Sequence, residues 1–172
     1  MSRVLVVDTS VARAAGGRPD AGFPSPQCTE VLECIGEYHF IAMSKALRQE
    51  WYKHASNYAL NWLSEQIGRK RVRLGAPAWS EEIPLLEAAQ TLEGNGPEEV
   101  RKDLHLIALA MVHDRRVVSN DLRQRTLLGR IPEPPPQLRE LMWASVMAGE
   151  ALPWVKEGCP ERDHLRVGYK SA

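Results

Sequence analysis

The chain of 172 residues has few cysteines. Cys28, Cys34 and Cys159 are the only ones, and no CxxC pair is present. An odd number without paired spacing argues against a disulfide framework, so we expect free thiols in a reducing compartment. Clusters of Cys and His with the spacing of zinc ligands are absent, which argues against a zinc site. Cys28 lies on the apolar stripe of a predicted helix and is interpreted as a core thiol.

Long apolar runs and a signal peptide are lacking as well. No signal peptide precedes Val4 and no run approaches membrane-spanning length, so we expect a cytoplasmic protein with no membrane partner. Neither sign of charge is in excess, because 22 Lys and Arg residues balance 22 Asp and Glu residues. Any footprint of a nucleic-acid partner must therefore be local. Hydrophobic residues make up 44% of the chain, which is enough for a globular core.

Three short apolar runs have the composition of buried strands, at residues 4–7, 40–43 and 116–119. Between and after them, apolar spacing predicts helices at about 26–38, 45–67, 83–93, 97–112 and 137–149. We expect residues 12–27 to be mostly loop, residues 131–136 to form a stiff proline-rich linker and the tail from Glu157 to be loosely held. This alternation indicates an α/β fold with a parallel sheet covered on both faces.

Four acidic residues are the candidates for chemistry. Asp8 and Asp121 end predicted strands, where α/β sheets bind ligands, and Glu50 and Asp103 lie on or beside apolar helix stripes. If the four carboxylates share a partly buried site, they can all be ionised only when cations neutralise them. Carboxylate oxygens favour Mg²⁺ or Mn²⁺ as those cations. Alternatively, Asp8 forms a turn or caps a helix and Glu50 is solvated. We interpret His54, His105 and Asp114 as structural residues.

The residues at and after the first predicted strand argue against three other protein families. A dinucleotide-binding fold needs a G-x-G-x-x-G motif, and the sequence has none. A phosphatase of the haloacid-dehalogenase type needs a second aspartate where Ser10 stands. An adhesion site of the von Willebrand type needs a hydroxyl where Ala12 stands. The acids at positions 8, 50, 103 and 121 therefore need another explanation.

The segments VLVVDTSV, KDLHLIALAM and VVSND, with Glu50 between the first two, resemble a PIN domain over about residues 3–130. The resemblance implies a three-layer fold with about five parallel strands and a divalent-metal-dependent ribonuclease of the toxin or RNA-processing type. It carries the roles of metal ligand and catalytic residue to Asp8, Glu50, Asp103 and Asp121. Ser10 and Asn120 match positions that support such a site.

The sequence departs from the family in two places. Residues 122–125, Leu-Arg-Gln-Arg, stand where many members have another acid or an aromatic, which predicts that a second metal is weakly held or arrives with the substrate. We expect a nuclease domain at 1–131, and a proline-rich linker, helix and tail at 132–172 packed on or beside it. That extension is longer than in compact toxins of toxin–antitoxin pairs. It could form a homodimer or partner surface, or could close the chain's own core.

Several partners follow from these expectations. RNA is the expected substrate, and an inhibitory partner protein is a further expectation. The basic residues that could contact the phosphates of the RNA are Arg69, Lys70, Arg71, Arg123 and Arg125, although each could equally be an ordinary surface residue. The alternative function is a non-catalytic PIN-like module for RNA binding or assembly. Retention of four costly carboxylates argues against it.

Overall fold

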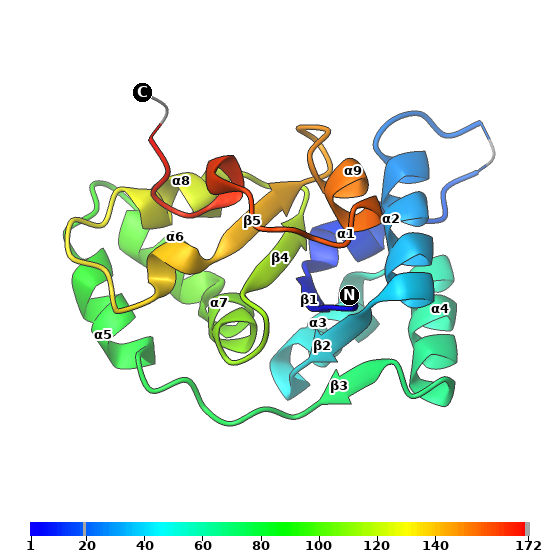
Figure 1. The fold of residues 1–172 in the computed structure, drawn as a ribbon, viewed down its shortest axis with the longest axis horizontal. Coiled ribbons are helices and arrows are strands. Elements are labelled where there is room, and N and C mark those ends of the chain that lie inside the picture. The colour runs from blue at the N-terminus through cyan, green and yellow to red at the C-terminus, as the bar shows by residue number, and fades with distance from the viewer. Residues whose placement is uncertain (19, 171–172) are drawn as a thin grey trace.

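The computed structural model describes residues 1–18 and 20–170. Its centre is a five-stranded parallel sheet (Figure 1) with strand order β3-β2-β1-β4-β5. The strands are β1 (Val4–Val7), β2 (Phe40–Met43), β3 (Val72–Leu74), β4 (Arg116–Ser119) and β5 (Met142–Ser145). Strands β2 and β3 follow β1 on one side of the sheet, and the chain then crosses to place β4 and β5 on the other side of β1. In such sheets this switch point opens a crevice at the carboxyl ends of the strands.

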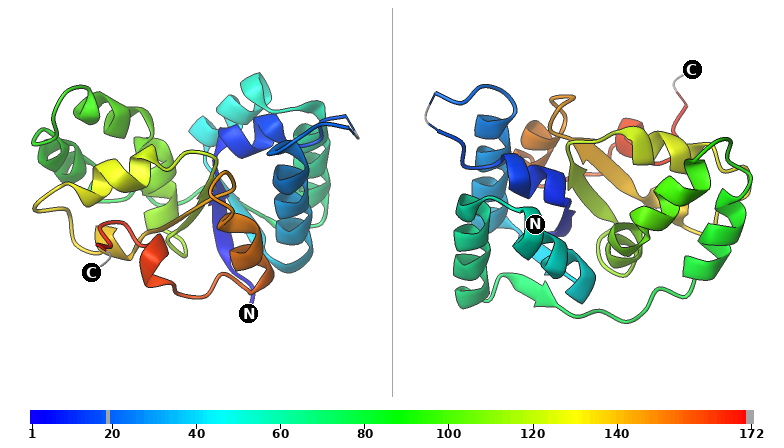
Figure 2. Two further views of the ribbon diagram at one scale, coloured as in Figure 1. Left: turned by 90° about the horizontal axis from the view of Figure 1, so that it is seen from above. Right: turned by 180° about the vertical axis from the view of Figure 1, so that it is seen from behind.

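Helices cover both faces of the sheet, so the expected three-layer α/β arrangement is confirmed (Figure 2). Helix α7 packs against β1, β2 and β4, whereas α2 packs against β2, and α9 packs against α2 and β5. The helices are α1 (Thr9–Ala14), α2 (Ser25–Tyr38), α3 (Lys45–His54), α4 (Asn57–Gly68), α5 (Glu82–Ala89), α6 (Gly96–Lys102), α7 (Leu104–Met111), α8 (Arg123–Gly129) and α9 (Ala151–Lys156), with 3₁₀ turns η1 (Leu138–Glu140) and η2 (Asp163–Leu165). No described helix is long and apolar enough to cross a membrane.

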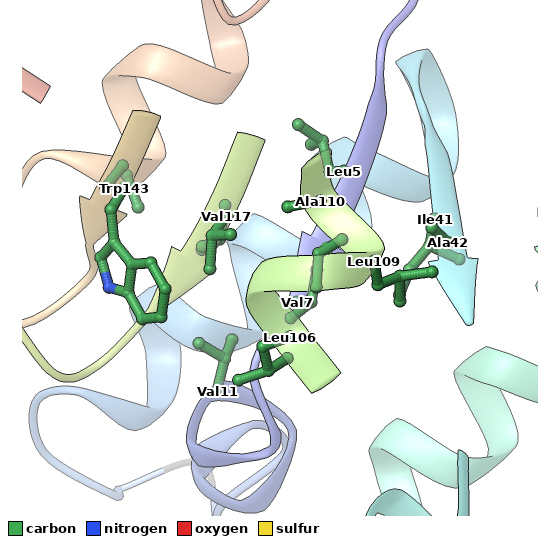
Figure 3. Packing of buried hydrophobic residues seen from close by; sticks show 14 of the residues in the cluster. Leu5, Val7, Val11, Ile41, Ala42, Leu106, Leu109, Ala110, Val117 and Trp143 are labelled. Atoms are coloured by element: carbon green, nitrogen blue, oxygen red, sulfur yellow. The ribbon is translucent and has the colours of Figure 1, made fainter. Parts of the chain in front are cut away.

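The core between the sheet and α7 is built from small and branched side chains (Figure 3). Leu5 and Val7 of β1 point to the same face because side chains alternate along a strand, and Leu106 and Leu109 of α7 pack in front of them. All of these side chains are buried, as is Cys28 in α2, which confirms the core role expected of that thiol. Strands buried on both faces explain the unbroken apolar runs in the sequence.

Two predicted long helices are each divided. The helix expected at 45–67 is interrupted because Ala55 and Ser56 are extended, and the Ser56 hydroxyl accepts a hydrogen bond from the Ala59 N–H to start α4. The helix expected at 97–112 is interrupted at Asp103, whose φ of −101° and ψ of 10° separate α6 from α7. Apolar periodicity runs through both breaks, so it could not reveal them.

The C-terminal part of the chain differs most from expectation. The helix predicted at 137–149 is wrong, because residues 142–145 form β5 and pair with β4 in the register Val117 to Trp143. The predicted boundary at residue 131 therefore does not separate two units, since the sheet continues across it. The tail expected to be loosely held buries Cys159, Leu165 and Val167. Helices α1, α8 and α9 and strand β3 were also not predicted.

Candidate acidic site

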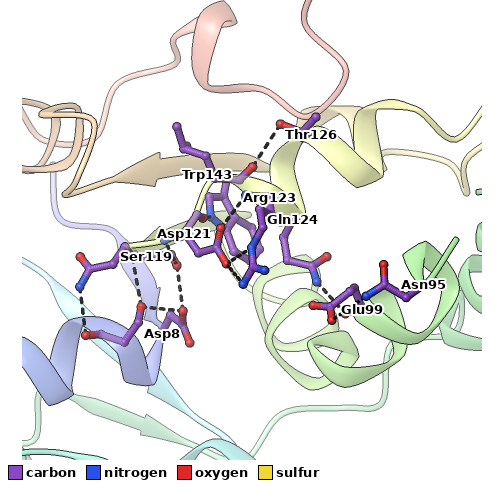
Figure 4. A network of polar contacts seen from close by, with 12 residues as sticks. Asp8, Asn95, Glu99, Ser119, Asp121, Arg123, Gln124, Thr126 and Trp143 are labelled. Carbon is purple, nitrogen blue, oxygen red and sulfur yellow. Dashed lines mark hydrogen bonds and ion pairs between the residues drawn. The ribbon is translucent and has the colours of Figure 1, made fainter. Parts of the chain in front are cut away.

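Asp8 lies where β1 ends and α1 begins, at the carboxyl edge of the sheet. Its N–H continues the β1–β4 ladder by donating to the Val118 carbonyl at 2.9 Å. Two hydroxyls, Ser10 Oγ and Ser119 Oγ, each donate to Asp8 Oδ2 at 2.8 Å (Figure 4). Both donors come from rigid elements, so the carboxylate is held in one orientation before any ligand arrives. The alternative role of Asp8 as a side-chain cap is not seen, because its side chain makes no capping bond to α1.

Asp103 lies at the break between α6 and α7, near enough to Asp8 for their charges to interact. Burial, and then the negative charge of Asp8, raise the pKa of Asp103 to about 6, although the Gln124 side chain and the charges of His105 and Lys102 act to lower it. A buried carboxylate beside a second carboxylate is held against its preferred ionisation. Asp8 and Asp103 therefore form an acidic pair that gains from any cation placed between them.

Glu50 reaches the same edge from α3 but is already partnered. Thr9 Oγ1 donates to Glu50 Oε2 at 3.1 Å. His105 Nε2 lies 3.3 Å from Glu50 Oε1, in a direction that does not form a hydrogen bond, so this is a charge contact when the imidazole is protonated. The expectation that His105 is structural stays a prediction, but the structure places its ring beside a predicted site residue, Glu50. Its position two residues after Asp103, at the start of α7, was the available signal.

Asp121 follows β4 by two residues and is bound by an arginine (Figure 4). Arg123 Nη2 and Nε lie 2.7 Å and 2.8 Å from Asp121 Oδ2, and the Arg123 N–H donates to Asp121 Oδ1 at 2.8 Å. Burial acts to raise the pKa of Asp121, but these contacts with Arg123 outweigh it and lower the pKa. The backbone is fixed by Ser119 Oγ, which accepts from the Asp121 N–H, and by Trp143 Nε1, which donates to its carbonyl.

Ser10 and Asn120 support the site by joining α1 to the end of β4. Asn120 N donates to Ser10 Oγ at 3.1 Å, and Asn120 Nδ2 donates to the Ser10 carbonyl at 3.0 Å. The Cys28 thiol lies 3.5 Å from Asn120 Oδ1 and orients that amide. These bonds fix Ser10, whose hydroxyl in turn holds Asp8. A supporting role for both residues is thus consistent with their contacts.

The oxygen atoms of these side chains are suitable ligands for a hard divalent cation. Their present arrangement, however, is not that of a formed metal site. Carboxylate and hydroxyl oxygens are the ligands that Mg²⁺ and Mn²⁺ prefer. Within residues 1–18 and 20–170, however, no group of three or more His, Cys, Asp or Glu side chains is arranged to hold a metal ion. Two of the four predicted ligands, Asp8 and Asp103, form the pair described above. The other two, Glu50 and Asp121, are turned to basic partners.

The predicted basic contacts are mostly engaged elsewhere. Arg125 Nη1 donates to the Trp143 carbonyl at 2.8 Å and forms a partly buried ion pair with Glu150 at 3.1 Å, which makes it a structural residue of β5 and α9. The run Arg69, Lys70 and Arg71 precedes β3, so it lies at the amino edge of a parallel sheet. The four acids lie at or beside the opposite, carboxyl edge. Of the predicted basic residues, only Arg123 reaches the acids.

Comparison of the chain with models of known protein families, with curated proteins and with solved structures gives no match. The resemblance to PIN domains accordingly stays an expectation that rests on the four acids and their order. What the chain does has to be inferred from its own residues: a five-stranded parallel sheet, an acidic pair at its switch point, and two flanking acids each held by a basic side chain.

Proposed function

We propose that this chain is a divalent-metal-dependent nuclease that hydrolyses phosphodiester bonds in RNA, as its resemblance to PIN domains implies. The observation that carries the proposal is the acidic pair Asp8–Asp103. Two carboxylates share a partly buried position, and no basic side chain pairs with either in the described part of the chain. A position that raises the pKa of Asp103 to about 6 would gain from a bound cation.

Asp8 and Asp103 would hold the metal, and Glu50 or Asp121 would join them after leaving His105 or Arg123. When bound, Mg²⁺ or Mn²⁺ supplies a Lewis acid that polarises a phosphoryl oxygen and lowers the pKa of water. The chain's own residues prepare the position. Ser10 and Ser119 hold Asp8 in place, so its carboxylate loses no orientational freedom when a ligand binds.

Arg123 supplies the cationic group nearest to the acids. Its side chain is 74% exposed and is attached to the site only through Asp121. If Asp121 served as a metal ligand, the guanidinium would be free to bind a phosphate oxygen with two parallel hydrogen bonds. This exchange would place a phosphate beside the acidic pair.

A cleavage assay across RNA and DNA oligonucleotides, with Mg²⁺, Mn²⁺ or EDTA, tests the proposal. Wild-type protein should cleave RNA with either metal and lose activity in EDTA, and the double variant Asp8→Asn/Asp103→Asn should lose it with metal present. Glu98→Gln, an exposed acid on α6, is the matched control and should retain activity. Unchanged cleavage by the double variant would falsify the nuclease proposal.

A second candidate function is a non-catalytic RNA-binding or assembly module. One observation favours it: Arg123 neutralises Asp121, and His105 lies against Glu50 and pairs with it when protonated, which reduces the need for a metal. Calorimetric titration with Mn²⁺ separates the candidates. Binding that disappears in Asp8→Asn supports the nuclease, whereas no binding at millimolar Mn²⁺ supports the module.

A further inference from the structure

A basic cavity of about 510 Å³ lies between α8 and the C-terminal segment, away from the acidic pair. Four cationic side chains line it, Arg125, Arg130, Arg166 and Lys170, against a single lining carboxylate, Glu150. In a protein whose total charge is balanced, this is a local excess of positive charge. Such an excess within a cavity attracts anions and raises their local concentration.

The cations of this cavity differ in how far they are already paired. Arg125 is matched to Glu150, and Arg166 contacts two exposed carboxylates, Glu161 at 2.8 Å and Asp163 at 3.5 Å, in surface pairs that contribute little. Arg130 and Lys170 are exposed and form no ion pair with the residues that the structure describes. Arg130 and Lys170 are therefore available to a ligand, and Arg166 can join them by exchanging its exposed carboxylate partners for a phosphate.

The cavity is built by a close approach of two glycines. Gly129 ends α8, and a Cβ added there would lie 3.0 Å from the backbone nitrogen of Gly168. Gly168 adopts a φ of +81°, which favours glycine. This contact brings Tyr169 and Lys170 beside Arg130, and the two views of Figures 1 and 2 both show the C-terminal segment beside α8. The cavity is thus a feature of the packed fold.

A second cavity of about 350 Å³ lies beside the first, and Thr126 and Arg130 line both. Arg123, which binds Asp121 at the start of α8, also lines the second cavity. Gly129, at the other end of α8, lies against Gly168, so the helix leads from the acids to the first cavity. The helix has seven residues, or about 10 Å of axis at ~1.5 Å per residue.

We infer that this surface binds the backbone phosphates of single-stranded RNA that extends from the acidic site along α8. The inference deepens the nuclease proposal and rests on it for the position of the scissile bond. Arg130, Arg166 and Lys170 bind phosphates, and Tyr169, which is 51% exposed, stacks on a base. A cationic groove with an exposed aromatic is the arrangement that holds single strands without reading their sequence.

Fluorescence anisotropy with a labelled 12-nucleotide oligouridylate in EDTA tests the inference without cleavage. The variant Arg130→Gln/Arg166→Gln/Lys170→Gln should bind at least about tenfold more weakly than wild type. The dependence of log K on log salt should become shallower by about 2, since each single-strand phosphate contact contributes ~0.7. Tyr169→Leu should weaken binding about fivefold with the slope unchanged. Lys170→Gln alone should reduce the slope by about 0.7 and serves if the triple variant unfolds.

The matched control is Lys45→Gln/Lys53→Gln/Arg73→Gln, which removes three exposed cations on α3 and β3 and should bind like wild type. Equal weakening in both triple variants would overturn the inference, because binding would then follow only total charge. Displacement of the RNA by equimolar uridine monophosphate or inorganic phosphate would also overturn it and leave a small-anion site. Binding lost only in the α8 variant, together with cleavage that ignores Asp8 and Asp103, would keep this surface and remove the nuclease.

Discussion

The centre of the acidic edge and its two flanks contain the same chemical groups under opposite electrostatic conditions. In the centre, burial and then the charge of the nearby Asp8 raise the pKa of Asp103 to about 6. At one flank His105 lies against Glu50, and at the other Arg123 binds Asp121 and lowers its pKa. Each flanking acid has a basic side chain against it, whereas neither Asp8 nor Asp103 forms an ion pair within the part of the chain that the structure describes.

This difference teaches where an external cation would be most effective. An ion pair that already exists on a partly exposed flank contributes little and gains little from a metal. An unpaired carboxylate in a partly buried position is costly, so a metal there relieves a charge that the fold cannot relieve itself. The centre is consequently the position to test first.

The largest expected effects are on the rate of RNA cleavage. They come from two single variants, one that removes a charge in the centre and one that removes a charge at a flank. With Mg²⁺ or Mn²⁺, Asp8→Asn should lower single-turnover cleavage of RNA by about 100-fold or more, because the held ligand is lost. Glu50→Gln should lower it about tenfold, since Glu50 must first leave His105. A flank variant that costs as much as the central one would contradict the division proposed here.

A smaller effect is expected on stability. In metal-free protein, Asp103→Asn should raise the free energy of unfolding by about 1–2 kcal/mol at pH 7.5, the figure being reduced for partial exposure. The wild-type carboxyl binds its proton more tightly when folded, so wild-type stability should fall as the pH rises from about 4 to about 6. The contribution of Asp121 has the opposite sign and is lost only as the pH falls below its ordinary range.

Urea denaturation in EDTA at several pH values measures this effect. The decline between about pH 4 and 6 should be absent in Asp103→Asn and retained in Glu98→Gln, whose carboxylate is exposed. If both variants keep the decline, another group is responsible for it. Added Mn²⁺ should stabilise wild type and leave Asp103→Asn nearly unchanged, because a ligand that binds the native state raises its stability.

Ser119→Ala should destabilise the protein by about 1 kcal/mol. The buried hydroxyl donates to Asp8 and accepts from the Asp121 N–H, so its removal loosens the centre and one flank together. Ser64→Ala, at an exposed position of α4, is the control and should change stability by less than about 0.5 kcal/mol. Thermal melting measures both. An equal effect in the two variants would show that Ser119 does not hold the centre.

The sequence predicted the parts of the fold that local patterns encode. The three buried strands at 4–7, 40–43 and 116–119 are confirmed, because an apolar run that ends in polar residues is a strong signal. The strand Met142–Ser145 was mistaken for helix, since its residues are buried on both faces and show no alternation. Strand β3 has three residues and two of them are exposed, which leaves no pattern to detect.

The candidate site was predicted in its residues but not in its contacts. The carboxyl ends of parallel strands lie at one edge, so Asp8 and Asp121 could be placed there from the sequence, and the structure adds that β1 and β4 are neighbours. That Asp103 interrupts a helix, and that His105 turns to Glu50, depends on a backbone break that periodicity does not reveal. The basic cavity joins α8 to the last residues of the chain, and no local pattern relates such distant segments.

The smallest expected effect gives the sharpest test of the comparison between the centre and its flanks, because Arg123→Gln leaves the flanking Asp121 unpaired like the central acids. Arg123→Gln leaves Asp121 without its cation, so Mn²⁺ affinity measured by calorimetry should rise about threefold; the gain is small because the pair is exposed. The control Arg101→Gln removes an equal charge from an exposed ion pair with Glu98 and should change the Mn²⁺ affinity less. The same Arg123→Gln change should weaken RNA binding in EDTA, since the guanidinium no longer meets a phosphate. Opposite signs for metal and RNA would assign both roles to Arg123, and a fall in metal affinity would show that it does not compete with a cation.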